Sequence, residues 1–226
     1  MEGLAKEVRK FVYDRMCDTS YPPLLEEIMG RFELTRGRAK QILKALQAEN
    51  QVVLLAGTDR ILMAHPFSAI SSPFRVTLSD GRAFFANCSW DSIAMHVMLG
   101  RDVRIDSFCH HSGAKIAIEL SNGTVESAQP EGTIVYLGLP AARWWQDIVH
   151  TCSNTMVYFG SRAHLDEWLT VNRIEKPGET LTIEKTIALS GPLYQRKMDL
   201  DYQRPSASEL RRHFAGLGLA GAFWDI

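Results

Sequence analysis

The feature that most constrains the fold is a series of short alternating segments joined by tight turns in the middle of the chain. Residues 74–78 and 82–86 flank a Ser-Asp-Gly turn, and their alternation of apolar and polar side chains predicts a β-hairpin. Asn122-Gly123 is a second strong hairpin signal. Further strand candidates are residues 103–108, 115–120, 124–128, 133–139 and 156–159. Strands joined by tight turns run antiparallel, so the pattern predicts a mostly antiparallel sheet.

The first 66 residues predict three helices followed by a hairpin. The first helix carries an apolar stripe from Leu4 to Met16, the second starts at Pro22 and stops at Gly30, and the third covers residues 35–49. Two apolar segments, residues 52–55 and 60–63, flank a turn and form the hairpin. This succession is typical of a winged-helix domain, a fold used widely for DNA binding.

The charge of this first segment argues against nucleic acid as its partner. Residues 1–66 contain ten Lys and Arg against nine Asp and Glu, which leaves a net charge of +1. A domain that binds DNA by neutralising phosphates normally has a larger excess. A structural or gating accessory role is therefore favoured over DNA contact.

A stretch rich in turn-forming residues, 66–73, predicts a linker and divides the chain into two domains. The expected boundaries are 1–66 for the winged-helix-like domain and 67–226 for a second domain. Helices in the second domain are expected at residues 90–98, 141–149, 162–170 and 182–189. The predicted fold class is α+β: a winged-helix-like domain, then a mostly antiparallel sheet flanked by helices.

Composition limits the compartment and the class of partner. The 226 residues are 46% hydrophobic, which is enough for a substantial core, and the net charge is −1. No apolar run is long enough to span a membrane, and the N-terminal segment is amphipathic and mixed in charge, unlike a signal peptide. We therefore expect a soluble cytoplasmic protein without a membrane partner.

The best-known cofactor and nucleophile motifs are absent or misplaced. Gly216 begins a GxGxxG match, but only five residues follow that match, so no phosphate-binding helix fits after it. The sequence has no GxxxxGK[ST] phosphate loop and no GxSxG nucleophile motif. His110 and His111 are adjacent on an extended segment and are expected to be a solvated pair rather than ligands of one ion. No organic cofactor is expected.

The four cysteines, at positions 17, 88, 109 and 152, lie too far apart for a zinc motif or a dense disulfide framework. Cys88 stands where a strand gives way to a helix, and a helix N-terminus favours an ionised thiol. Asp91 follows three residues later, on the same side of the first helical turn. The pair could act together on one bound atom. Alternatively, Asp91 caps backbone amides and Cys88 fills core space.

The segment FFANCSWDSIAMHVMLGRDVRIDSFCHHSGAKIAIEL, with Cys152 and the later Val-Tyr-Phe-Gly-Ser and Asp-Glu-Trp runs, resembles the organomercurial (alkylmercury) lyase family. The resemblance covers roughly residues 74–170. It implies that Cys88, Asp91 and a second, distant cysteine form the catalytic site, and Cys152 is the cysteine available for that place. It also implies a structural role for Cys109. The tail from Tyr194 is unlike the best-known members and indicates a divergent branch with another substrate.

The resemblance implies protonolytic cleavage of a carbon–mercury bond, R–Hg–X to RH and Hg(II). Cys88, Asp91 and Cys152 would also hold the Hg(II) product, since thiolates are the softest protein ligands. The partners implied are a small organomercurial substrate, cellular thiols and a downstream mercuric reductase. A proton-shuttling Asp91 needs a raised pKa, which its apolar neighbours favour.

Five apolar side chains are candidates for the lining of a substrate pocket, although plain core is the favoured interpretation of each: Phe84, Trp90, Met98, Phe108 and Tyr158. Two other readings of the whole chain remain open. One is a thiolate metal-binding protein on the same scaffold without lyase activity. The other is a winged-helix regulator whose second domain senses a ligand.

Overall fold

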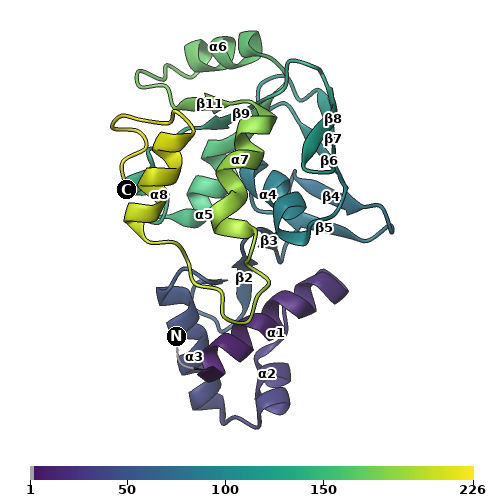
Figure 1. Cartoon of the computed structure of the whole chain (residues 1–226), viewed down its shortest axis with the longest axis vertical. Helices are drawn as coiled ribbons and strands as arrows, with labels where there is room; N and C mark the ends of the chain where they lie inside the picture. The colour runs from purple at the N-terminus through teal and green to yellow at the C-terminus, as the bar shows by residue number, and fades with distance from the viewer. Residues whose placement is uncertain (1–2) are drawn as a thin grey trace.

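The computed structural model describes residues 3–226, so residues 1 and 2 of the expected first domain lie outside the described residues. The chain begins with three helices, α1 (Gly3–Thr19), α2 (Leu25–Phe32) and α3 (Arg36–Ala48), followed by strands β1 (Val53–Leu54) and β2 (Ile61–Ala64). Figure 1 shows this group as a lobe below the remainder of the molecule. Three helices and a hairpin are thus present in the predicted order.

The second helix differs from its predicted bounds at both ends. It begins at Leu25 rather than at Pro22, because Leu24 is still extended and donates its backbone N–H to the Glu27 carboxylate at 2.8 Å. It also continues through Gly30 and ends where Glu33 takes a left-handed conformation, with φ of 52°. Glycine lowers helix propensity but does not stop a helix whose apolar face is buried.

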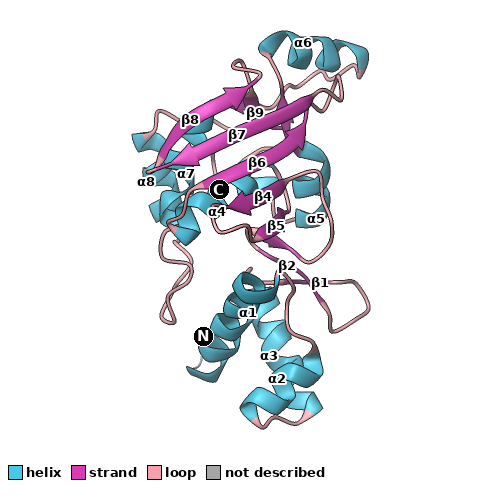
Figure 2. Cartoon of the chain, turned by 90° about the vertical axis from the view of Figure 1, so that its right-hand side faces the viewer, coloured by secondary structure: helices cyan, strands magenta, loops and turns pink. Residues whose placement is uncertain are grey.

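Strands from both predicted domains form one antiparallel sheet. Its order is β1-β2-β3-β5-β4-β6-β7-β8, with β3 (Phe67–Ser68) pairing with β2 on one side and β5 on the other. The remaining strands are β4 (Arg75–Leu78), β5 (Ala83–Ala86), β6 (Val103–Phe108), β7 (Lys115–Ser121) and β8 (Thr124–Gln129). The predicted linker at residues 66–73 therefore contains a strand, since buried Phe67 ties it to the core. Figure 2 shows β4, β6, β7 and β8 side by side.

Helix α4 (Ser89–Leu99) follows β5 directly and packs against α7 (Ile183–Tyr194). The expected helix at 90–98 is confirmed, and Gly100 ends it in a left-handed conformation with φ of 58°. A second antiparallel sheet has the order β10-β9-β11, made of β9 (Ile134–Leu137), β10 (Met156–Phe159) and β11 (Glu179–Leu181). Helix α6 (Arg162–Val171) lies at the top of Figure 1, beyond this small sheet.

The helix predicted at residues 141–149 is broken into short pieces. These are a 3₁₀ turn at Ala141–Arg143, α5 (Ile148–His150) and a π-helical turn at Thr151–Thr155. The break occurs because Asp147 leaves helical geometry and its side chain accepts the backbone N–H of His150 at 3.0 Å. The chain restarts there in a new direction, which determines where Cys152 lies.

The C-terminal region contains helical structure beyond the predicted end at residue 189. Helix α7 extends to Tyr194 although it contains Pro192, which removes the backbone donor to Ala188 O. His213 of α8 (Ala207–Gly216) contacts that carbonyl through Nε2 at 3.1 Å. The segment between α7 and α8 runs down to α1 before it returns (Figure 1). Within residues 3–226, no helix has the length and apolar character that crossing a membrane requires.

Candidate active site

Cys88 is the N-cap residue of α4, as its position in the sequence predicts. Its backbone is extended, with φ of −155° and ψ of 178°, and its Sγ accepts the backbone N–H of Asp91 at 3.3 Å. The three-residue spacing therefore produces a direct contact between the sulfur and the first turn of the helix. Both side chains are buried.

The Asp91 carboxylate accepts three side-chain hydrogen bonds from three parts of the chain. His65, between β2 and β3, donates from Nδ1 to Oδ2 at 3.0 Å. Asn87 donates from Nδ2 to the same oxygen at 3.0 Å, and Tyr194, at the end of α7, donates from its hydroxyl to Oδ1 at 2.7 Å. Both carboxylate oxygens are thus fixed within the core.

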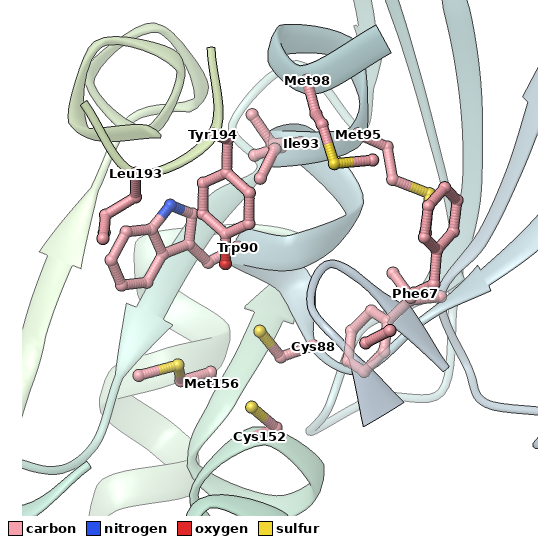
Figure 3. Close-up of a cluster of buried hydrophobic side chains, with 14 of the residues drawn as sticks. Phe67, Cys88, Trp90, Ile93, Met95, Met98, Cys152, Met156, Leu193 and Tyr194 are labelled. Carbon is pink, nitrogen blue, oxygen red and sulfur yellow. The ribbon is translucent and has the colours of Figure 1, made fainter. Parts of the chain in front are cut away.

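Cys152 reaches the same place from the π-helical turn. Its thiol lies close enough to that of Cys88 for each to shift the pKa of the other. One ligand atom from each of His65, Asp91 and Cys152 lies within 4.8 Å of the others. Figure 3 shows the two sulfur atoms approaching each other below the Tyr194 hydroxyl. The structure therefore brings together the three residues named from the sequence, across more than sixty positions of the chain.

The ionisation of these groups differs from the sequence-based expectation. Burial raises the pKa of the Cys88 thiol well above its ordinary value, and the neighbouring Cys152 and Asp91 add to this effect. The hydrogen bond with Cys88 lowers the pKa of Cys152, but burial and the Asp91 charge outweigh it and leave that pKa raised. The predicted easy ionisation of Cys88 is therefore wrong, because desolvation exceeds the effect of the helix N-terminus.

The raised pKa expected for Asp91 is also wrong. Burial raises the pKa of this carboxyl, but the charge and hydrogen bond of His65, with the hydrogen bonds of Tyr194 and Asn87, lower it below the ordinary value. Donors aimed at a carboxylate stabilise its charged form. Asp91 is therefore a carboxylate at rest, while both thiols carry their protons.

The site opens into a small cavity. Apart from Tyr194, its polar lining consists of His65, Cys88, Asp91, Cys152, Lys197 and Arg204. Its apolar lining consists of Trp90, Trp144, Trp145, Ile148, Met156 and Leu193. An apolar chamber with convergent polar groups at one end is typical of a small-molecule site.

Of the five apolar residues considered for the pocket, Trp90 lines this cavity. Phe84 and Met98 are core residues, and Phe108 is exposed. The Tyr158 hydroxyl is engaged in the core, where it donates to Ser89 O at 2.9 Å. Sequence periodicity identifies apolar faces but does not tell which part of a face borders an empty space.

Cys109 and the adjacent histidines lie outside this cavity. Burial raises the pKa of the Cys109 thiol, but hydrogen bonds from Ser112 and from backbone amides outweigh it and bring it to about 7. Its Sγ lies 3.5 Å from Nδ1 of His164. His110 is exposed, and His111 pairs with Glu167 at 3.2 Å, in keeping with separate rather than shared roles.

Sequence reasoning missed four residues of the site: His65, Asn87, Tyr194 and Lys197. Asn87 had a local signal, since it directly precedes Cys88. The other three are distant in sequence from the Cys88 and Asp91 pair, and no periodicity or motif marks them. Their contribution depends on the packing of the β2–β3 junction and the end of α7 against α4.

The comparisons with known proteins identify the family of this chain. The alkylmercury lyase family model matches residues 67–195. An alkylmercury lyase of Bacillus cereus is 26% identical over 120 residues, which is 53% of this chain and 52% of the relative. An alkylmercury lyase of Staphylococcus epidermidis is 24% identical over 155 residues, covering 69% and 68% of the two chains. The chain thus matches about half the length of the first relative.

A solved structure shares the fold. The crystal structure of the mercury-bound form of MerB2 superposes with a TM-score of 0.68 at 20% identity and covers 86% of this chain and 91% of that chain. The likeness supports the α+β arrangement of N-terminal helices, a large antiparallel sheet, a small sheet and flanking helices. Since the family model matches more than half of its residues, this chain belongs to the alkylmercury lyase family.

Proposed function

We propose that this protein cleaves carbon–mercury bonds by protonolysis, converting R–Hg–X to RH and Hg(II). The observation that carries the proposal is the convergence of two thiols and one carboxylate, Cys88, Cys152 and Asp91, at one end of an apolar cavity. Mercury(II) is a soft ion, and two converging sulfurs bind it more tightly than nitrogen or oxygen donors do. The apolar walls suit a small alkyl or aryl group.

The resting protonation of the site fits a proton relay. One thiol replaces X on mercury, and its proton leaves with X as HX. Coordination of the second sulfur then acidifies its thiol, because a metal-bound thiol is deprotonated readily. The Asp91 carboxylate accepts this second proton and passes it to the carbon bonded to mercury. The products are RH, HX and Hg(II) held by two thiolates, so atoms and charge balance.

Proximity is the main contribution of the protein to this reaction. Asp91 is fixed by His65, Asn87 and Tyr194, so the carboxylate does not need to find its orientation when substrate enters. The Cys88 sulfur lies beside the backbone N–H of Asp91. Ionic mercury would afterwards leave to cellular thiols, which exchange with the cysteine ligands.

The test is to incubate the purified protein with phenylmercury and excess thiol and to measure benzene. The wild type should release benzene, and Cys88→Ala and Cys152→Ala should each abolish release while changing the melting temperature little. Cys17→Ala is the matched control, since Cys17 lies outside the cavity and should leave turnover unchanged. Benzene release no greater than that of Cys88→Ala would refute the lyase and leave a thiolate metal-binding protein.

Asp91→Ala separates mercury binding from bond cleavage. The variant retains both sulfurs, so it should still bind mercury, whereas it should lose most protonation of carbon. Mercury retention after gel filtration, measured beside benzene release, tests both. Full turnover by Asp91→Ala would exclude this carboxylate as the relay.

We also propose that residues 1–66 form a winged-helix-like accessory domain and residues 67–226 the catalytic domain. Support comes from the three helices and hairpin at the start of the chain and from the site, which draws its thiols and carboxylate from the second part. Gel-shift assays across promoter fragments at low salt should show no specific binding. A specific, strongly salt-dependent shift would favour the regulator instead.

A further inference from the structure

Lys197 is a buried basic residue that the proposed reaction does not use. It lies just after α7, lines the cavity and has only 3% of its surface exposed. Its Nζ lies 5.8 Å, 5.2 Å and 5.4 Å from the ring centres of Tyr13, Tyr194 and Tyr202. Within residues 3–226, Nζ makes no hydrogen bond or ion pair with a protein group. An ammonium group among rings without a counter-ion is costly to bury.

The backbone around Lys197 is held firmly by the first helix. Arg9 of α1 donates from Nη1 to Lys197 O at 2.7 Å and from Nη2 to Asp199 O. Its guanidinium also lies 5.4 Å and 5.3 Å from the ring centres of Tyr13 and Tyr202. Figure 1 shows the segment after α7 descending to α1. The position of Lys197 is thus fixed by residues of the first helix and of its own segment, residues 194–202.

Basic side chains outnumber acidic ones in the lining of the cavity. Arg204 also lines it, with the guanidinium carbon 4.8 Å from the ring centre of Trp145. The carboxylate of the lining, Asp91, is already engaged by three donors. Mercury(II) bound by two thiolates is neutral and adds no charge. One further anion would therefore balance the charge of the basic side chains in the cavity.

The energetics of Lys197 agree with an incomplete site. Burial lowers the pKa of its amine to about 7, and the nearby charges of Arg204 and Arg9 lower it as well, while Asp91 raises it. An anion beside Nζ would stabilise the charged amine. The attraction between this anion and Nζ would be much stronger in the cavity than at the protein surface, because the cavity excludes most water.

We propose that Lys197 forms a subsite for a carboxylate, so that this protein favours organomercurials that carry one. The inference rests on the proposed function and names its substrate class. The carboxylate belongs either to the organic group or to the thiol that delivers the mercury. Lys197 lies beyond residues 67–195, so the family match does not include it.

The first experiment compares phenylmercury with 4-mercuribenzoate, which differ by one carboxylate. Binding is measured by quenching of the fluorescence of Trp90, Trp144 and Trp145, and turnover by release of benzene or benzoate. The wild type should favour 4-mercuribenzoate about tenfold, the factor expected for one charged hydrogen bond. Lys197→Met and Lys197→Gln should lose that preference, whereas the control Arg196→Gln, exposed and adjacent, should retain it.

A second arm identifies where the carboxylate resides. Phenylmercury is supplied on 3-mercaptopropionate or on 2-mercaptoethanol, so that the carrier thiol alone is charged or neutral. A preference for the charged carrier thiol, without a preference for 4-mercuribenzoate, assigns the subsite to the carrier. A preference for 4-mercuribenzoate, without a preference for the charged carrier thiol, assigns it to the organic group. Either preference must disappear in both Lys197 variants.

The outcomes separate this inference from the proposed function. A Lys197-dependent preference in binding without any turnover supports the subsite and refutes the lyase. A wild type without preference in either arm overturns the subsite, whatever its turnover. An equal loss for charged and uncharged substrates in both Lys197 variants also overturns it.

Discussion

At the scale of single residues, the chemistry of the site depends on how each ionisable group is solvated. Asp91 and Cys88 are both fully enclosed, yet the pKa of one lies below its ordinary value and that of the other well above it. The difference arises because three donors surround the carboxylate, whereas the thiol has a carboxylate and another thiol as neighbours. Burial alone therefore does not determine the direction of a pKa shift.

Tyr194→Phe tests this account of Asp91. The variant loses the hydrogen bond from the tyrosine hydroxyl to Oδ1, which helps to lower the Asp91 pKa. A lowered carboxyl pKa stabilises the folded state above its unfolded value of about 4, and this contribution disappears as the pH falls through the folded pKa. Tyr194→Phe should therefore cost roughly 1–3 kcal/mol at pH 7 and less below about pH 4.

Urea unfolding at a series of pH values measures this difference. Tyr202→Phe is the matched control, because its hydroxyl donates to the carbonyl of Leu193 at 2.9 Å rather than to a carboxylate. The unfolding free energy that Tyr202→Phe loses should not change over the acid range. Equal pH dependence of the two variants would contradict the role assigned to Tyr194.

At the scale of elements, the site depends on how α4 packs against α7. Trp90 of α4 donates from Nε1 to the Ser190 hydroxyl of α7 at 2.9 Å, and that hydroxyl donates to Thr186 O at 2.7 Å. Both partners are buried. This contact fixes a ring that lines the cavity and holds the helix that carries Tyr194.

Ser190→Ala should leave the Trp90 N–H without its acceptor. The expected loss is about 1–3 kcal/mol of unfolding free energy, the cost of an unpaired buried donor. Thr170→Ala on α6 is the control, since Thr170 makes the same type of bond to the carbonyl four residues earlier, but at the surface. It should change stability by about 0.5 kcal/mol or less. Equal losses in chemical denaturation would show that the Trp90 contact contributes nothing.

At the scale of the whole molecule, the first helix and the C-terminal tail depend on each other. Arg9 is completely buried and binds backbone carbonyls nearly 190 residues away. It thereby connects the N-terminal helices to the wall of the cavity. This contact supports the structural role that we propose for the first segment.

Arg9→Met should loosen the tail from α1. One buried and one partly buried carbonyl lose their donor, so we expect a loss of about 2–4 kcal/mol and faster hydrogen exchange in residues 196–206. Arg15→Met provides the control on the same helix, because its ion pair with Glu27 is partly exposed and worth about 1 kcal/mol or less. Unchanged exchange in the tail of Arg9→Met would mean that other contacts hold it.

Local signals predicted the features that are local in the structure. The Asn122-Gly123 hairpin, helix α4 and strands β6 and β10 occur where the pattern indicates them. The same holds for the contact between Cys88 and Asp91, which lie in one helical turn. Errors arose where a tertiary contact overrode the local pattern, as in the strand at Phe67 and the helix that continues through Pro192.

The sequence by itself determined the antiparallel strands, the capped helix and the spacing of thiol and carboxylate, because these follow from side chains a few positions apart. Only the tertiary structure decided that His65 and Tyr194 hold Asp91, that burial raises the pKa of both thiols, and that Lys197 enters the cavity. These facts depend on burial and on groups brought together from distant segments. The local sequence around a residue specifies neither how deeply that residue is buried nor which distant groups lie beside it.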